Sequence, residues 1–300
     1  MNRRPQIVLL ADGKRLHLQD GPIDLIVEAS GREAEVRSAY EAAARRFTGL
    51  LDELCTELVE LRKAANPGRT TLKGVVARRM HAAAAPFAED GFITPMAAVA
   101  GSVAEEILDA MLAATPLARA YVNNGGDIAL HLSGCEQFCI GLMDRPDAQG
   151  VMRTMAIDAG DPARGIATSG RHGRSFSLGI ADAVTVLAKT ASQADAAATV
   201  IANAVDLPDH PAVLRVPANQ LQFDSDLGDR LVTRDIGALT GNEIEAALLA
   251  GSRRARQLLA AGLIEGAALR LLGETVVVGA RENRAPHALH KVRLQQAIHA

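Results

Sequence analysis

Short apolar or alternating runs along the chain predict β-strands, and Gly-rich turns separate them. Two or three strands are expected within residues 6–30, where Asp12-Gly13 and Gly21-Pro22 are turn signals. After residue 119 the pattern changes to short apolar segments between turns. The later strands that we predict are 120–123, 128–132, 138–142, 151–157, 165–168, 183–187 and one or two within 267–278.

Apolar residues that recur every third or fourth position predict helices. The clearest is one long amphipathic helix over residues 33–64, which Asn66-Pro67-Gly68 ends. A helix that opens at Pro95 carries small residues in its first turns, so it either packs closely in the core or forms a dimer face; we favour the core. Other helices are predicted at 71–85, 193–205 and 241–261, and the proline-containing segment 207–229 is predicted to be a surface excursion.

The interleaving of helices with strands predicts an α/β or α+β sandwich. We find no clean β-α-β alternation and no G-x-G-x-x-G after a strand, so the pattern does not support a dinucleotide-binding Rossmann domain. The last residues, 281–300, are polar and basic and include three histidines. This composition favours a frayed or docking helix over a metal-binding tract.

Composition narrows the class of protein. The 300 residues carry a net charge of −3, so the chain lacks the excess of positive charge that is typical of proteins that bind nucleic acid or an anionic membrane. No apolar stretch approaches the roughly 18 residues of a membrane span, and the run at residues 7–11 is shorter than a signal-peptide core. Three cysteines are too few and odd in number for a disulfide framework. We therefore expect a cytoplasmic protein.

Two Gly-containing segments carry residues that suit a phosphate-bearing ligand. Asn124-Gly125-Gly126-Asp127 offers bare backbone beside a carboxylate, although a tight hairpin would need the same residues. Thr168-Ser169-Gly170-Arg171, followed by His172, offers hydroxyls, backbone N–H groups and cationic side chains for an anion. An ordinary polar turn is the alternative for this second segment.

A third candidate lies at the start of the predicted helix 193–205. Asp195 and Thr199 are four residues apart, so their oxygens would share one helix face and could hold a hard cation such as Mg²⁺. The alternative is a capping box, in which Ser192 and Asp195 only stabilise the helix start.

Two further features leave their role open. Asp182 stands before a predicted strand and is either a turn residue or a carboxylate pointed into a cleft. Cys135 and Cys139 lie four residues apart with no second cysteine pair nearby, which is too few ligands for a typical zinc site. A thiol role in catalysis stays open for them.

Taken in order, these motifs resemble the ApbE superfamily. Its members carry a Gly-Gly-acidic segment, a Thr-Ser-Gly segment and an A-D-A-x-x-T motif at a helix start. The matching residues here are Gly125-Gly126-Asp127, Thr168-Ser169-Gly170, and Ala194-Asp195-Ala196 with Thr199. The chain is most similar to an uncharacterised prokaryotic branch of the superfamily, over about residues 90–275. That branch also resembles the segments 94–101 and 177–182 of this sequence.

ApbE proteins are FAD:protein FMN transferases, which cleave FAD with Mg²⁺ and place FMN on a Thr or Ser of an acceptor protein. The resemblance implies one large α/β domain over residues 1–280, with mixed or antiparallel sheets packed against helices, and a polar tail at 281–300. It implies Mg²⁺ at Asp195 and Thr199, and FAD, FMN or another nucleotide as the ligand. The residues expected to touch that ligand are Asn124, Gly125, Gly126, Asp127, Thr168, Ser169, Gly170 and Arg171, and those expected to be catalytic are Asp182 and His172.

Two departures from the family pattern bear on activity. Ala100 stands where the transferases carry the Lys of a G-G-x-x-K-G segment, and residues 175–182 replace a His-x-x-D-P-x-T-G segment. Three functions are therefore compatible with the sequence. They are a divergent, Mg²⁺-dependent transferase or phosphoanhydride-cleaving enzyme, a ligand-binding or assembly protein without catalysis, and an enzyme with non-flavin chemistry at Cys135 or Cys139. The sequence leaves a homo-oligomer open as well.

Overall fold

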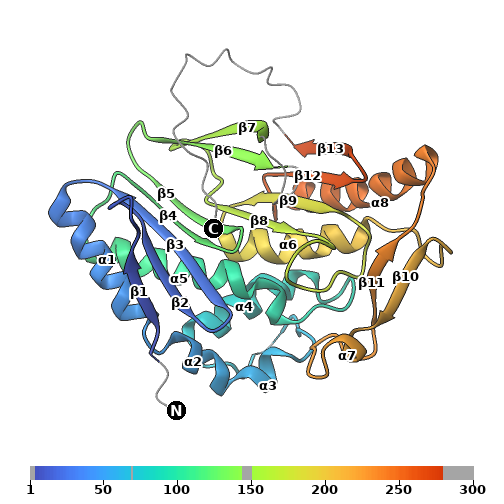
Figure 1. The fold of residues 1–300 in the computed structure, drawn as a ribbon, viewed down its shortest axis with the longest axis horizontal. Coiled ribbons are helices and arrows are strands. Elements are labelled where there is room, and N and C mark those ends of the chain that lie inside the picture. Colours follow the sequence, from blue (N-terminus) through green and yellow to red (C-terminus); the bar gives the residue numbers. More distant parts are fainter. Residues whose placement is uncertain (1–3, 69, 144–150, 280–300) are drawn as a thin grey trace.

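One large antiparallel sheet runs through the molecule (Figure 1). The computed structural model describes residues 4–68, 70–143 and 151–279. In the order in which they pair, the strands of the sheet are β1 (Gln6–Leu9), β2 (Leu16–Asp20), β3 (Ile23–Ser30), β4 (Arg119–Asn124), β5 (Asp127–Leu132), β8 (Gly165–Ser169), β9 (Ala183–Ala188), β12 (Gly266–Leu271) and β13 (Glu274–Gly279). Each neighbouring pair is antiparallel.

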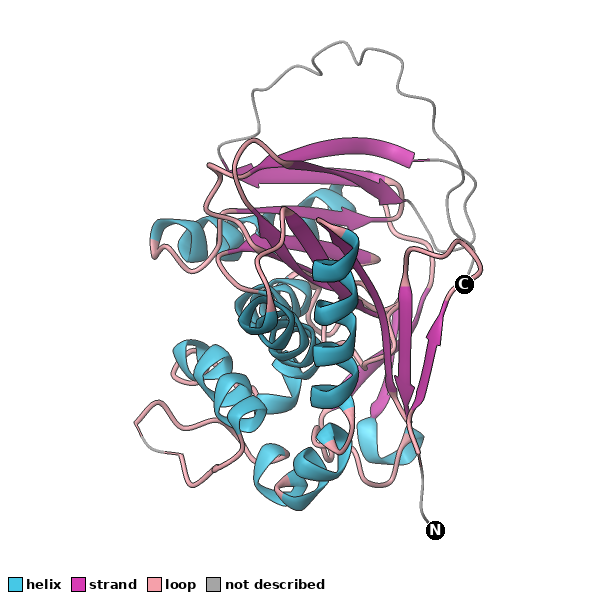
Figure 2. Ribbon diagram, turned by 90° about the vertical axis from the view of Figure 1, so that its left-hand side faces the viewer, coloured by secondary structure: helices cyan, strands magenta, loops and turns pink. Residues whose placement is uncertain are grey.

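The helices gather mainly on one side of this sheet (Figure 2). The long ones are α1 (Glu33–Phe47), α4 (Val75–Ala84), α5 (Val99–Ala114), α6 (Ala191–Ala204) and α8 (Gly241–Ala260); the short ones are α2 (Leu50–Thr56), α3 (Leu58–Leu61), α7 (Ala218–Leu221), η1 (Ala85–Phe87) and η2 (Pro95–Ala98). A separate hairpin of β6 (Gln137–Met143) and β7 (Val151–Asp158) lies beside the large sheet (Figure 1). A second hairpin pairs β10 (Val213–Pro217) with β11 (Leu231–Ile236).

The central strands carry apolar side chains on both faces of the sheet, and neighbouring residues of a strand contribute to different faces. On β5, Leu130 and Leu132 pack with Ile166 of β8 and Ile157 of β7, whereas Ala129, the residue before Leu130, joins the helical core. Successive side chains of a strand point to opposite faces, so such a strand needs a cover on each side. The helices cover one face and the β6–β7 hairpin packs over the other.

The prediction of one long helix over residues 33–64 is wrong, because the structure divides that segment into the three helices α1, α2 and α3. The chain breaks at Thr48 and Gly49, and Gly49 has a φ of 85°, a left-handed conformation that an α-helix does not contain. The apolar period continues across the break, since Phe47, Leu50 and Leu54 are all buried. The excursion at 207–229 also contains β10 and α7, which the sequence did not indicate.

The small residues of α5 are explained by close packing in the core, as we expected. A Cβ added to Gly101 would lie 2.3 Å from the backbone carbonyl oxygen of Ala191, so α5 and α6 touch through bare backbone. Eight residues of α5 are buried, including Val103, Ile107 and Met111. This contact fixes the start of α6 against the start of α5, where the candidate site lies.

The predicted fold class is confirmed: helices pack against antiparallel sheets in one domain. No helix in the described part of the chain is long and apolar enough to cross a membrane. The predicted polar tail at 281–300 lies outside the described residues, and the domain boundary at 280 stays a prediction.

Candidate functional site

A cavity of about 650 Å³ opens between the large sheet and the helices. Its apolar lining comes largely from α2, α3 and the η2–α5 region and includes Leu51, Leu54, Leu58, Met96 and Val99. Its polar lining comes from the β4–β5 turn, the end of β8, and α6. The polar residues on this wall include Asn124, Asp127, Thr168, Ser169, Asp195, Thr199 and Asn203. The cavity thus brings together most of the residues that the sequence singled out, and we take it as the candidate site.

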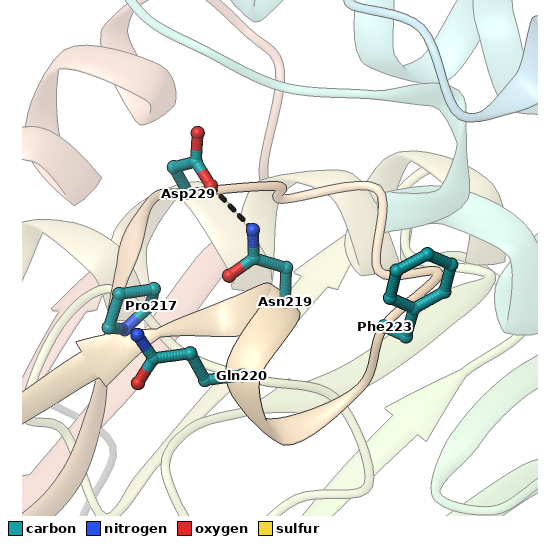
Figure 3. Close-up of a pocket in the computed structure, with 5 residues that line it drawn as sticks. All are labelled: Pro217, Asn219, Gln220, Phe223 and Asp229. Atoms are coloured by element: carbon teal, nitrogen blue, oxygen red, sulfur yellow. Dashed lines mark hydrogen bonds between the residues drawn. The ribbon is translucent and has the colours of Figure 1, made fainter.

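A second hollow, of about 480 Å³, lies on α7 and the segment after it (Figure 3). Pro217, Asn219, Gln220, Phe223 and Asp229 line it, and an Asn219–Asp229 hydrogen bond crosses it. None of the residues predicted to be functional belongs to this hollow, so we do not place the site there.

Asp195 projects from the second turn of α6 onto the cavity wall. Its Oδ2 accepts a hydrogen bond from the backbone N–H of Gly101 at 2.9 Å. The helix begins after Thr190, whose hydroxyl oxygen accepts the N–H of Gln193 at 3.3 Å. The capping-box alternative for Ser192 and Asp195 is therefore wrong, because Thr190 is the cap and Asp195 faces α5.

Asp127 reaches the same cavity from the start of β5. Its Oδ1 accepts the backbone N–H of Thr168 at 3.1 Å, which joins β5 to the end of β8. In the described part of the chain neither Asp127 nor Asp195 forms an ion pair with Lys, Arg or His. Burial raises the pKa of Asp127 to about 7. Burial first, and the nearby charge of Asp127 second, raise the pKa of Asp195 well above its usual value.

The two carboxylates and Thr199 are a donor set that fits Mg²⁺. Thr199 also lines the cavity, one helical turn beyond Asp195. Carboxylate and hydroxyl oxygens are hard ligands of the kind that Mg²⁺ takes, with water or phosphate oxygens completing its shell. Among the described residues no cluster of three or more His, Cys, Asp and Glu forms a metal site. A cation here would therefore rely on hydroxyl, carbonyl and ligand oxygens besides the acid pair.

The Gly-Gly segment is both a tight hairpin and part of the cavity wall. Asn124 pairs with Asp127 across the two-residue turn, and the Asn124 side-chain amide donates to the carbonyl oxygen of Ala100 at 3.2 Å. Gly125 lines the cavity, whereas Gly126 does not and donates its N–H to the side chain of Asn123. On the neighbouring strand end, Ser169 and Gly170 line the cavity with Thr168.

Arg171, His172 and Asp182 come together, but away from the cavity lining. Oδ1 of Asp182 accepts a hydrogen bond from Nε of Arg171 at 2.8 Å and lies 2.6 Å from Nη2 of the same arginine in an ion pair. Nε2 of His172 lies 3.4 Å from this oxygen. The other carboxylate oxygen accepts the N–H of Leu272. The cluster ties the loop after β8 to the β12–β13 turn, so Arg171 already has a protein partner for its charge.

Two cavity residues were missed or left unresolved by the sequence analysis. Asn203 of α6 lines the cavity, and its Oδ1 accepts the N–H of Leu178 at 2.9 Å, which holds the 173–178 loop against α6. No local pattern marked it. Arg174 stood in the sequence as a neighbour of Arg171, and only the fold shows that Arg174 is the one on the cavity wall.

The cysteines do not form a second centre. Cys55, Cys135 and Cys139 are all free and exposed. Cys55 lines the cavity from α2, whereas Cys135 and Cys139 do not belong to its lining. A role for the latter two thiols therefore finds no support in the geometry of this site.

Comparison with known families places these residues in a wider context. A protein-family model described as "AbpE bacteria" matches residues 7–277. A UPF0280 protein of Methanopyrus kandleri is 33% identical over 232 residues, which cover 75% of this chain and 82% of that protein. A UPF0280 protein of Methanococcus vannielii is 41% identical over 125 residues, covering 40% of this chain and 49% of that protein.

Among solved structures, the apo form of Pseudomonas stutzeri flavinyl transferase ApbE is similar over 93% of this chain and 95% of its own. The TM-score is 0.42 and the sequence identity is 11%.

Proposed function

Because this chain belongs to the family described as "AbpE bacteria", as its motifs predicted, we propose that it binds FAD with Mg²⁺ in the cavity and cleaves the phosphoanhydride of FAD. One observation carries the proposal. Two half-buried carboxylates, Asp127 and Asp195, lie on the wall of a large cavity, and neither forms an ion pair with a cationic side chain in the described part of the chain. Carboxylates withdrawn from water are normally compensated, and a cation bound from outside the protein would compensate this pair.

The rest of the cavity supports a ligand with an apolar and a phosphorylated part. Its volume of about 650 Å³ lies within the range of small-molecule pockets. Leucines of α2 and α3 offer an apolar wall for an aromatic ring system, and the Gly125 turn with Thr168 and Ser169 offers backbone and hydroxyl groups for phosphates. FAD has both parts.

In this proposal Asp195 and Thr199 hold the Mg²⁺, and Asp127 adds the second negative charge. A bound Mg²⁺ supplies Lewis-acid polarisation of phosphoryl oxygens. The bond that breaks is the one between the two phosphates of FAD. AMP leaves, and FMN passes to a hydroxyl of an acceptor protein or, with water, is released. The Gly101 N–H fixes the Asp195 carboxylate, so the ligand oxygen is oriented before the reaction.

A ligand-binding protein without catalysis is the second candidate, and Ala100 favours it. Ala100 lines the cavity with a methyl group at the position where the resemblance to the transferases would place a Lys. A cation at that position would stabilise charge on the phosphates, and its loss removes a contribution of several kcal/mol where it operates.

Two assays on the purified protein separate these candidates. FAD affinity is measured by quenching of flavin fluorescence with Mg²⁺ and with EDTA, and AMP release is followed by chromatography. We expect Mg²⁺-dependent FAD binding, AMP release, and loss of AMP release in Asp195→Asn. The double variant Cys135→Ala/Cys139→Ala is the matched control and should behave as the wild type.

Each result has a distinct meaning. FAD binding without AMP release would leave the non-catalytic candidate. The absence of both FAD binding and AMP release would contradict the proposed function. Loss of AMP release in the cysteine variant, with Asp195→Asn still active, would move the chemistry to the thiols.

A further inference from the structure

The cationic side chains of the cavity differ in whether the protein already neutralises them. In the described part of its lining, the cationic residues are Arg62 and Arg174. Nη2 of Arg62 lies 2.8 Å from Oδ2 of Asp224, on the loop after α7. Arg174 forms no hydrogen bond or ion pair with the described residues. Arg174 is therefore the cavity cation whose charge the protein itself leaves available.

The position of Arg174 places this charge beside the Gly-Gly turn. A Cβ added to Gly125 would lie 3.5 Å from Cζ and Nη1 of Arg174, so the guanidinium lies over the bare backbone of that turn. The same turn leads directly into Asp127. The guanidinium and the acid pair thus line the same cavity, and no ion pair joins them in the described part of the chain.

We propose that Arg174 binds a phosphate group of the ligand and makes the cavity selective for phosphorylated over unphosphorylated molecules. Asp127 and Asp195 would repel an anion that entered the cavity alone, so phosphate binding needs positive charge on the cavity side. The planar fork of an unpaired guanidinium matches phosphate oxygens in two hydrogen bonds. Arg171, three residues earlier, is already bound by Asp182 and is not available for this role.

The inference rests on the proposed function in taking a flavin as the probe, and a pair of flavins tests it. FMN and riboflavin share the ring system and differ in the phosphate. Their dissociation constants are measured by fluorescence quenching in Mg²⁺ for the wild type, Arg174→Gln and Arg174→Lys. Arg234→Gln, which removes a charge from an exposed position on β11 outside the cavity lining, controls for net charge.

We expect the wild type to bind FMN more tightly than riboflavin. Arg174→Gln should weaken FMN binding by about tenfold or more, the loss of a charged hydrogen bond, and leave riboflavin binding unchanged. The FMN affinity of Arg174→Lys should lie between those of the wild type and Arg174→Gln. The FMN affinity of Arg234→Gln should equal that of the wild type.

Three results would overturn the inference. One is unchanged FMN affinity in Arg174→Gln. Another is an equal loss of FMN and riboflavin binding, which would indicate a structural role for Arg174. The third is loss of FMN selectivity in Arg171→Gln in place of Arg174→Gln.

Failure of the proposed function is distinguishable from failure of this inference. If the wild type binds neither flavin, the flavin assignment fails, and the same variants are titrated with ADP and adenosine. Weaker ADP binding in Arg174→Gln, with adenosine unaffected, would then support the phosphate role. If the wild type and Arg174→Gln bind ADP equally well, or if neither binds ADP, the phosphate-binding role of Arg174 is contradicted.

Discussion

Two groups of carboxylates in this protein differ in whether arginines compensate their charge. On α5, Glu106 accepts hydrogen bonds from Nε of Arg46 at 2.6 Å and from Nη1 of Arg79 at 2.8 Å. Arg79 also pairs with Glu105 at 3.2 Å and with Asp109 at 2.7 Å. Burial alone would raise the pKa of Glu106, but the two arginines bring it below its usual value.

At the cavity, Asp127 and Asp195 have only backbone N–H donors, and the pKa of each is raised. Arginines therefore compensate one set of carboxylates, whereas the cavity pair has no such partner. Because two arginines bind Glu106, the chain does place cations beside carboxylates where the fold itself requires them. This difference is the reason for our proposal that a bound ligand, and not the protein, balances the charge of the cavity pair.

The largest effect is expected when the compensated cluster is broken. Arg79→Ala removes ion pairs to Glu105, Glu106 and Asp109 and should lower the free energy of unfolding by about 3 kcal/mol, because three charged contacts are lost and the buried Glu106 keeps one arginine in place of two. Urea denaturation measures the change. Arg78→Ala on the same helix, where the side chain is exposed, is the control and should cost less than about 0.5 kcal/mol. If Arg79→Ala and Arg78→Ala lower the free energy of unfolding equally, the ion pairs of Arg79 do not contribute specially to stability.

The opposite sign is expected at the cavity. In EDTA at pH 8, Asp195→Asn replaces a half-buried carboxyl group whose ionised form the protein does not compensate, and keeps an oxygen for the Gly101 N–H. The free energy of unfolding should therefore rise, by about 1 kcal/mol. The same urea experiment tests it. A loss of stability as large as that of Arg79→Ala would mean that Asp195 is a structural group like Glu106.

A third effect is expected in the pH dependence of the metal-free protein. The pKa of Asp127 is about 7 in the folded chain and has its usual value of 3.8 when unfolded. The folded state thus binds more protons between about pH 4 and pH 7, so this group makes stability fall as pH rises through that window. From pH 5 to pH 8 in EDTA, the Tm of the wild type should fall by about 4 °C more than that of Asp127→Asn. Parallel Tm curves for the two proteins would contradict the raised pKa.

Much of the fold could be predicted from the sequence because its signals are local. The strands within 6–30 and the helix that became α6 follow from alternation and from helical spacing in their own residues. The break at Gly49 could not, because the apolar period runs through it and a left-handed turn leaves no mark on that period. The β10–β11 pair was hidden because its two strands meet only in three dimensions.

Most residues on the polar wall of the candidate site could be named from the sequence, but their arrangement could not, and Gly126, Arg171, His172 and Asp182 lie outside the cavity lining. Asp195 and Thr199 were found from their spacing, yet spacing equally supported a cap, and only the start of α6 at Thr190 decides between them. The approach of Asp127 to Asp195 depends on how β5, β8 and α6 pack. The sequence named Arg171 as a ligand-binding residue, but in the fold Asp182 pairs with Arg171, and Arg174 is the one that lines the cavity.

The most direct test of the account is whether the acid pair binds a divalent cation. Mn²⁺, a spectroscopic substitute for Mg²⁺, is titrated into the metal-free wild type, Asp195→Asn and Asp127→Asn, and free Mn²⁺ is followed by electron paramagnetic resonance. The account predicts one Mn²⁺ per chain, displaced by Mg²⁺, with affinity lowered by about tenfold or more in each variant. A wild type that binds no Mn²⁺, or variants that bind it as tightly as the wild type, would contradict the account.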